Sequence, residues 1–157
     1  MESRNINSIY FILQPNPEFE KVFSLTNKMK YTVFRWLVKK RVRFKDKQEL
    51  FQIAFWEWYY TLKKADLPPK LVMICISNAV NLYIAYNSQK GERRPTLYSK
   101  STSITLTPYV TPTVNLNNMK LKLLNYELKI INVSKAPGQI ETSEIKRAKL
   151  LKRGEYW

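Results

Sequence analysis

The chain changes its hydrophobic periodicity near its middle. Before about residue 90, apolar residues recur every three to four positions, which is typical of helices that bury one face. After residue 102, apolar and polar residues alternate over short runs, which is typical of strands. Residues 91–106 (GERRPTLYSKSTSITL) join the two halves. The pattern predicts a helical unit and a β unit that meet at a basic connection.

The first half predicts a strand followed by helices. The strand, at residues 5–13, has apolar side chains on both faces, which predicts burial on both sides. Asn16 is expected to cap the first helix, with Pro17 at its first position. The three helices are predicted at residues 17–40, 48–64 and 69–89. The buried stripe of the first helix is predicted to be Phe19, Val22, Leu25 or Thr26, Met29, Val33, Trp36 and Leu37.

The second half predicts short strands. They are expected at residues 103–107, 114–116, 119–133 and 145–151. Residues 119–133 form the clearest hairpin, in which Lys120 and Lys122 alternate with apolar residues and point outward. Tyr156 and Trp157 predict the start of a further strand with an exposed edge. The fold class is therefore α+β: a small β-barrel or sheet with an insertion of three to four helices after the first strand.

The composition indicates a polyanionic partner. Lys and Arg number 27 against 12 Asp and Glu, which gives a formal net charge of +15 over 157 residues, enough for one domain or two small subdomains. Such a charge attracts nucleic acid first and anionic membranes second. Aromatic residues make up 13%, and rings beside cations suit single strands or RNA. Trp56 and Tyr60, which lie off the buried face of the second helix, are candidates for stacking. A basic surface that only maintains solubility is the alternative.

The lack of histidine and the single cysteine limit the kinds of active site and metal site that this chain can form. The chain has no His and one cysteine, Cys75. This excludes an intrachain disulfide, cysteine cages for metals and the usual histidine-dependent active sites. Cys75 is expected to be a buried structural thiol. We predict no catalytic residue, no metal site and no cofactor. The sequence shows no apolar run of membrane-spanning length and no signal peptide, so a cytoplasmic (intracellular) protein without a membrane partner is expected.

Acidic residues give little support for catalysis. Two-metal nucleases need about three carboxylates around their Mg²⁺ ions. The two aspartates, Asp46 and Asp66, lie at helix boundaries, where capping explains them. The helical half otherwise offers Glu49, Glu57 and Glu92. A small self-sufficient metal-dependent DNA nuclease built from scattered glutamates stays open as an alternative function.

Basic residues gather in three parts of the sequence. The densest is KKRVRFKDK at residues 39–47, with Lys28, Lys30 and Arg35 upstream. It is either a phosphate-facing surface or a solvated helix end, because cations favour helix C-termini. We expect the cations to form one continuous side where the helices meet the β unit. The candidate nucleic-acid-binding residues are Lys39, Lys40, Arg41, Arg43, Lys45, Lys47, Arg93, Arg94, Lys100, Lys146, Arg147, Lys149, Lys152 and Arg153.

Short motifs follow one another in a distinctive order. They are Leu67-Pro68, Gly91 with Pro95, SITL at residues 103–106, and IKRAKLLKRGEYW at residues 145–157. Placed after an initial strand and a helical insertion, they resemble the N-terminal half of the TnpB family of transposon-encoded RNA-guided nucleases, which are related to type V CRISPR effectors. The likeness spans essentially the whole chain. Each motif is short, and their order and spacing carry the resemblance.

The resemblance implies a wedge-like β-barrel domain and a recognition-like helical domain. Residues 1–14 plus 96–157 would form the first, and residues 15–95 would be inserted as the second. In the family these parts hold the guide RNA, the guide–target duplex and the DNA motif beside the target. Cutting belongs to a RuvC-like domain, which this chain lacks and which would be a further domain or subunit.

The sequence departs from the family at two places. Thr96, Leu97 and Tyr98 follow Pro95 where an aromatic and a basic residue are usual, and Thr105 stands where Arg is frequent. Specific RNA contacts at those positions are therefore not expected.

The first hypothesis is a nucleic-acid-binding protein of a mobile element or virus. The alternatives are the self-sufficient nuclease and a structural or partner-binding protein that docks through residues 156–157.

Overall fold

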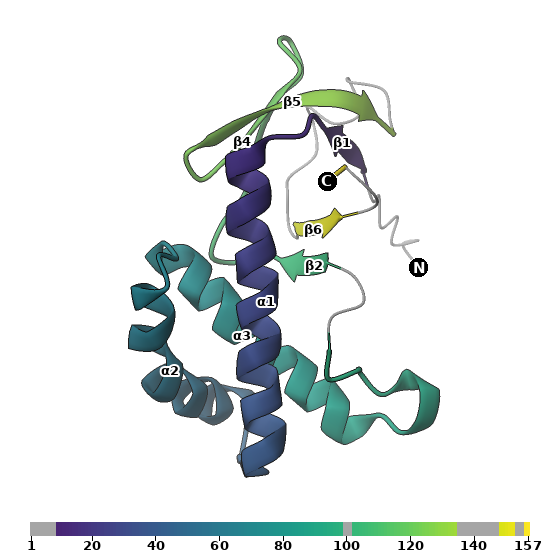
Figure 1. Ribbon diagram of the computed structural model, residues 1–157. Coiled ribbons are helices and arrows are strands. Elements are labelled where there is room, and N and C mark those ends of the chain that lie inside the picture. Colours follow the sequence, from purple (N-terminus) through teal and green to yellow (C-terminus); the bar gives the residue numbers. More distant parts are fainter. Residues whose placement is uncertain (1–8, 99–101, 135–147, 153–155) are drawn as a thin grey trace, which may run out of the picture.

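A computed structural model of the chain describes residues 9–98, 102–134, 148–152 and 156–157 (Figure 1). The helices are α1 (Pro17–Lys40), α2 (Lys47–Lys64) and α3 (Pro69–Ser88), followed by a short 3-10 turn, η1 (Gly91–Arg93). The strands are β1 (Phe11–Leu13), β2 (Thr102–Thr105), β3 (Thr113–Asn115), β4 (Lys120–Leu123), β5 (Tyr126–Val133) and β6 (Lys149–Lys152). The α+β class and the insertion of three helices after the first strand are confirmed.

Side-chain caps begin the first two helices. The Asn16 side-chain oxygen accepts the backbone N–H groups of Glu18 and Phe19 at 3.0 and 3.1 Å. The Asp46 carboxylate accepts the N–H of Glu49 at 2.9 Å. Each cap satisfies donors that a helix start leaves without an intrahelical partner. Asp46 therefore has the capping role predicted from the sequence.

The described strands form two antiparallel sheets and no closed barrel. The larger sheet has the order β1-β5-β4-β3, and β2 pairs with β6. The sequence predicts either a small β-barrel or a sheet, and the described residues form sheets. The predicted burial of the first strand on both faces is wrong, because Tyr10 and Ile12, which share one face, are 60% and 41% exposed. Residues 5–8 of that predicted strand lie outside the described residues.

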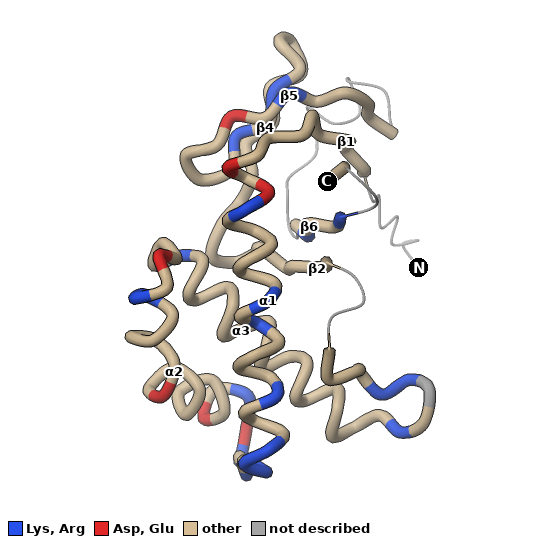
Figure 2. The backbone as a smooth tube through the Cα atoms, viewed as in Figure 1, with Lys and Arg blue, Asp and Glu red and all other residues tan. Residues whose placement is uncertain are grey.

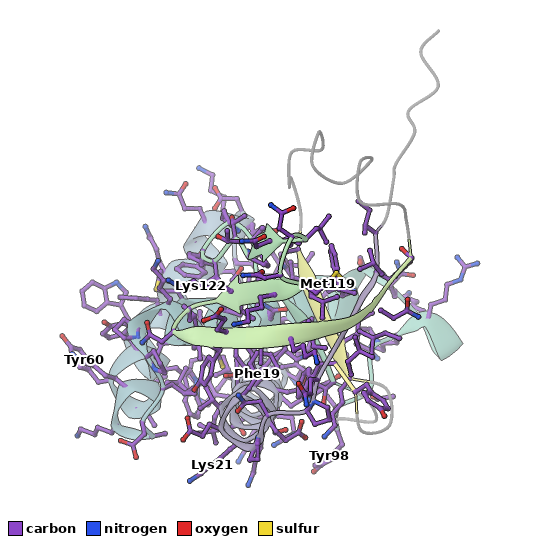
Figure 3. The ribbon with its side chains drawn as sticks, turned by 90° about the horizontal axis from the view of Figure 1, so that it is seen from above. Phe19, Lys21, Tyr60, Tyr98, Met119 and Lys122 are labelled. Atoms are coloured by element: carbon purple, nitrogen blue, oxygen red, sulfur yellow. The ribbon has the colours of Figure 1, made fainter. Side chains whose placement is uncertain are left out.

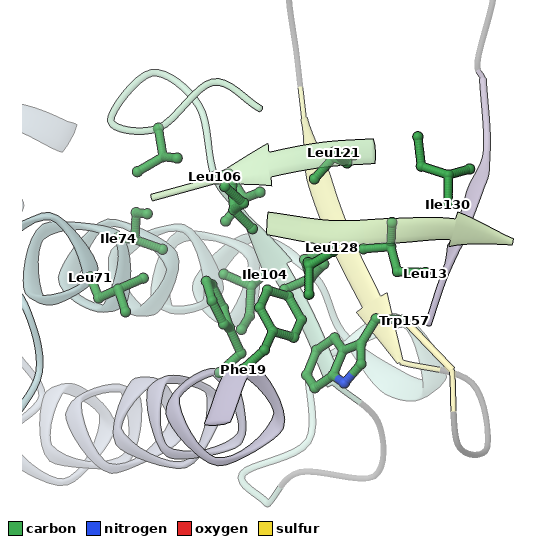
Figure 4. Packing of buried hydrophobic residues seen from close by; sticks show 14 residues of the cluster. Leu13, Phe19, Leu71, Ile74, Ile104, Leu106, Leu121, Leu128, Ile130 and Trp157 are labelled. Atoms are coloured by element: carbon green, nitrogen blue, oxygen red, sulfur yellow. The ribbon is translucent and has the colours of Figure 1, made fainter. Parts of the chain in front are cut away.

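One hydrophobic cluster joins the helices to the strands (Figure 4). Phe19 of α1 and Ile74 of α3 pack against inward-facing residues of five strands. Trp157 is 7% exposed and belongs to this cluster. Its backbone oxygen accepts the N–H of Leu13 at 2.9 Å, and its indole N–H donates to Glu20. The predicted exposed edge is therefore wrong at Trp157, because this residue closes the core beside β1.

A second cluster lies between the three helices and has α3 at its centre. Nine residues of α3 are buried, including Cys75, whose pKa burial raises to about 12. Among the described helices, only α3 is long and apolar enough to cross a membrane, with 20 residues and a mean hydropathy of 1.3. Its contacts with α1, α2 and β2 account for this composition. The first cluster spans both halves of the chain, so the division into domains 1–14 plus 96–157 and 15–95 stays a prediction.

Two buried polar side chains fix β2 to the helices. The Lys30 ammonium of α1 donates to the Ser103 oxygen at 2.6 Å. The Asn78 amide of α3 donates to the oxygens of Thr105 and Ile74 at 2.9 and 2.7 Å and accepts the Thr105 N–H at 2.9 Å. The Asn78 side chain thus bonds both backbone polar groups of Thr105, as a neighbouring strand would. β6 pairs with β2 on its other side.

Replacing Asn78 is expected to destabilise the whole fold. Asn78→Ala leaves the N–H and carbonyl of Thr105 without their partner, so the free energy of unfolding should fall by about 2 kcal/mol. Urea unfolding followed by circular dichroism measures this change. Asn81→Ala, on the exposed side of the same helix, is the matched control and should stay within about 0.5 kcal/mol of the wild type. Equal losses in the two variants would contradict the role of Asn78.

Candidate nucleic-acid interface

The predicted basic residues occupy three separate places (Figure 2). Arg93 and Arg94 follow α3, and Lys149 and Lys152 belong to β6. The connection between α1 and α2, taken with the helix ends that flank it as residues 39–47, carries Lys39, Lys40, Arg41, Arg43, Lys45 and Lys47. Four candidates lie outside the described residues: Lys100, Lys146, Arg147 and Arg153. The described candidates therefore do not form the one continuous basic side that was expected between helices and strands.

The connection between α1 and α2 directs its cations outward. Arg41, Arg43 and Lys45 are exposed, whereas Val42 and Phe44 between them are half-buried. The Phe44 ring lies 6.0 Å from the ring of Tyr83 in α3, and the Tyr83 hydroxyl donates to the Val42 oxygen at 2.7 Å. The backbone is thus held against the helical core by every second residue. The side chains between them are left in solvent.

The positive charge of this connection is not neutralised locally. Its six cations are all exposed. Its one acid, Asp46, is engaged as the cap of α2. The ion pairs found among the described residues join Lys120 to Glu127 and Lys152 to Glu20, which lie elsewhere. The connection therefore presents uncompensated cations to solvent.

The outer face of α1 extends this charge. Lys21, Lys28, Arg35 and Lys39 are spaced by seven, seven and four residues, which places them along one face of a helix with about 3.6 residues per turn. Over residues 21–45 the sequence holds nine cations and no acid. We name as the basic track the side chains of Lys21, Lys28, Arg35, Lys39, Arg41, Arg43 and Lys45. Its helical part is about 27 Å long at about 1.5 Å per residue.

A shallow groove with an exposed aromatic ring lies beside the basic track. Its volume is about 390 Å³, and it is lined by Ser24, Asn27, Lys28, Tyr31, Arg35 and Tyr98. The Arg35 guanidinium donates to the Leu97 oxygen at 3.1 Å and lies 4.8 Å from the centre of the Tyr98 ring. Tyr98 is 69% exposed and points away from the strands (Figure 3). An exposed ring beside cations is an arrangement that can stack a base next to its phosphate.

Two predicted cations already have partners in the protein. The Arg94 guanidinium stacks 3.6 Å from the centre of the Tyr86 ring and donates to the Tyr86 oxygen at 3.0 Å. Lys152 pairs with Glu20, and its ammonium lies 5.6 Å from the Trp157 ring. Arg94 keeps its charge on the surface, but the charge of Lys152 is compensated. Lys152 is therefore a weaker candidate for phosphate than the residues of the basic track.

Sequence reasoning missed part of this surface. Lys21 and Tyr98 were not candidates, and Lys28 and Arg35 were noted only as neighbours of the dense run. Two signals in the sequence indicate Lys21, Lys28 and Arg35: the seven-residue spacing of the α1 cations and the lack of acids over residues 21–45. Neither signal indicates Tyr98. The first signal depends on reading the helix face, and the second on counting charges over the whole segment rather than within its densest part.

The described acids do not form a metal site. No group of three or more Cys, Asp or Glu residues in the described part of the chain could hold a metal ion. Glu57 is exposed on α2, and the side chain of Glu92 is outside the described part. The nuclease alternative therefore gains no support from the geometry of these residues.

No family model, curated protein or solved structure matches this chain. The resemblance to the TnpB family stays a prediction.

Lys30 contrasts with the cations of the basic track. It is 4% exposed, and its pKa is lowered from 10.5 to about 8, mainly by desolvation; Cys75 opposes this shift, and the nearby Lys149 contributes to it. The unfolded chain then binds more protons than the folded one above about pH 8. Stability from this group therefore rises with pH from about 8 to 10.5.

Comparison with Lys30→Met should isolate this effect. Between pH 7 and 9 the wild type should gain about 1 kcal/mol in unfolding free energy relative to Lys30→Met, which has no ammonium to deprotonate. Urea unfolding at pH 7, 8 and 9 measures the difference, and Cys75 is common to both proteins. A difference that stays constant over this range would show that Lys30 titrates normally.

Proposed function

We propose that this protein binds nucleic acid, RNA or DNA, through phosphate contacts along the basic track. The observation that carries the proposal is the run of nine cations without an acid over residues 21–45, together with the exposure of most of them. Close cations without acids repel one another and are stabilised by a polyanion that releases its counterions. A surface that served solubility alone would not need this segregation of charge.

The groove beside the basic track favours single-stranded nucleic acid. Tyr98 offers a ring face for an unpaired base, and Lys28 and Arg35 lie within the same groove for the adjacent phosphates. Tyr31 also lines this groove, and burial raises the pKa of its hydroxyl, which is available as a hydrogen-bond donor to a ligand. Bases in a duplex are already stacked on each other and cannot use Tyr98 in this way.

A wider proposal follows from the resemblance to TnpB nucleases. The helical insertion would act as the recognition part, the strands as the wedge part, and the ligand would be a guide-type RNA with its DNA target. The position of the helices after the first strand and of the basic track within them supports this assignment. Cutting would be the work of a RuvC-like domain or subunit. We place the protein in the cytoplasm of the host of a mobile element or virus.

Removing four cations of the basic track should reduce the salt dependence of binding. The variant combines Lys28→Ala, Lys39→Ala, Arg43→Ala and Lys45→Ala. Fluorescence anisotropy with a labelled single-stranded RNA or DNA gives the affinity at several salt concentrations. The slope of log K against log salt is negative, and its magnitude should decrease by about 3, since each lost contact with a single strand removes about 0.7.

A charge-matched control separates the basic track from net charge. Lys64→Ala, Lys70→Ala, Lys90→Ala and Lys122→Ala remove four exposed lysines elsewhere and should leave the slope nearly unchanged. Equal slopes for the two variants would refute the assignment, whether both fell or neither did. Circular dichroism melting of both variants checks that each remains folded.

Tyr98→Ala should weaken binding to single strands without changing the salt slope. Loss of one base–ring stack is expected to lower the affinity for single-stranded RNA or DNA about tenfold, while affinity for a duplex of the same length stays the same. Tyr10→Ala is the matched control because Tyr10 is also exposed but lies outside the groove. An equal loss on duplex and single strand would show that Tyr98 does not stack on a base.

A further inference from the structure

The outer face of α2 exposes large aromatic side chains. Trp56 is 76% exposed and Tyr60 is 66% exposed, and Figure 3 shows Tyr60 pointing away from the body of the protein. The buried residues of α2 are Leu50, Ala54 and Leu62, and helical geometry places them on the side opposite Trp56. Exposed aromatic patches of this kind mark interaction surfaces.

The exposed rings of α2 contact other aromatic rings of the same helix. The centre of the Phe55 ring lies 4.7 Å from that of Tyr59 and 6.1 Å from that of Trp56. The Tyr59 ring in turn lies 5.4 Å from that of Tyr60. These contacts restrict the exposed rings, so that docking a partner orders few additional side chains.

The exposed face of α2 is symmetric about Trp56. Glu49 and Lys63 each lie seven residues from Trp56, and Gln52 and Tyr60 each lie four residues from it. At about 3.6 residues per turn, all five share one face of the helix. One end of this face is thus acidic, the other basic and the centre aromatic.

This pattern fits a second copy of the same helix in antiparallel orientation. We propose that two copies of this chain associate through α2 around a two-fold axis at Trp56. The axis places Glu49 of each copy opposite Lys63 of the other, Gln52 opposite Tyr60, and the two Trp56 rings together. The surface is self-complementary, as a two-fold interface requires.

Nucleic acid is a poorer occupant of this face. Glu57 is exposed next to Trp56, and Glu49 lies at the end of the same face, so phosphates would approach two carboxylates. The basic track lies on α1 and the connection after it, not on the outer face of α2. The charge of +15 on each copy opposes association, and salt screens this repulsion. Dimerisation should therefore strengthen with salt, whereas binding of nucleic acid weakens.

Charge exchange between Glu49 and Lys63 tests the proposal. Sedimentation equilibrium of the full chain at moderate salt gives the dimer dissociation constant, with the wild type expected to dimerise below about 100 μM. Glu49→Lys and Lys63→Glu should each raise this constant about tenfold, since the symmetry turns two ion pairs into two repulsions. The double variant Glu49→Lys, Lys63→Glu should return to within about twofold of the wild type because both pairs are restored with reversed sign.

The single variants also distinguish the interface from net charge. Glu49→Lys raises and Lys63→Glu lowers the total positive charge, so a net-charge effect would move the two dissociation constants in opposite directions and overturn the proposal. A monomeric wild type would overturn it too. If Trp56→Ala with Tyr60→Ala weakened nucleic-acid binding and left association unchanged, the face would belong to nucleic acid instead. Circular dichroism confirms that each variant folds.

Discussion

The fold depends on how β2 is held between the helices and β6. β6 pairs with one edge of this short strand, and the other side meets the buried side chains of Lys30 and Asn78. Without these side chains, polar backbone groups of β2 would be buried without partners. The same contacts join α1 and α3 to the strands at one place. They therefore set which face of α1 turns inward and which is left to solvent.

The two sides of α1 handle positive charge in opposite ways. The inward side buries Lys30, whose desolvation lowers its pKa and makes its charge unfavourable. The outward side keeps Lys21, Lys28 and Arg35 near water, where a single charge is well solvated. The sequence has no acid between residues 21 and 45 that could relieve the mutual repulsion along this outward side. The helix thus uses Lys30 to hold β2 and keeps its other cations at or near the surface.

Local signals in the sequence predicted the helices and strands. The buried face of α1 depends on long-range contacts, which the sequence pattern did not show. Asn16 with Pro17, Asp46 and the hairpin of residues 119–133 act within a few residues, so their roles follow from the sequence. The stripe predicted for α1 missed Phe23 and Phe34, which are both fully buried. They face different clusters, Phe23 the strands and Phe34 the other helices. A helix with two packing partners buries a wider face than one periodic stripe describes.

The availability of cations at the candidate site also depends on long-range contacts that the sequence does not show. Density along the chain selected Lys152, yet Glu20, which is 132 positions earlier, neutralises it. Density also selected the connection at residues 39–47, where Val42 and Phe44 anchor the backbone and leave the cations free. A cation is available to a ligand when no acid in the folded chain neutralises it, and only the tertiary structure shows whether this is so. The basic track lies on α1 and the connection after it, whereas the aromatic face lies on α2, so the two proposed interactions involve different residues.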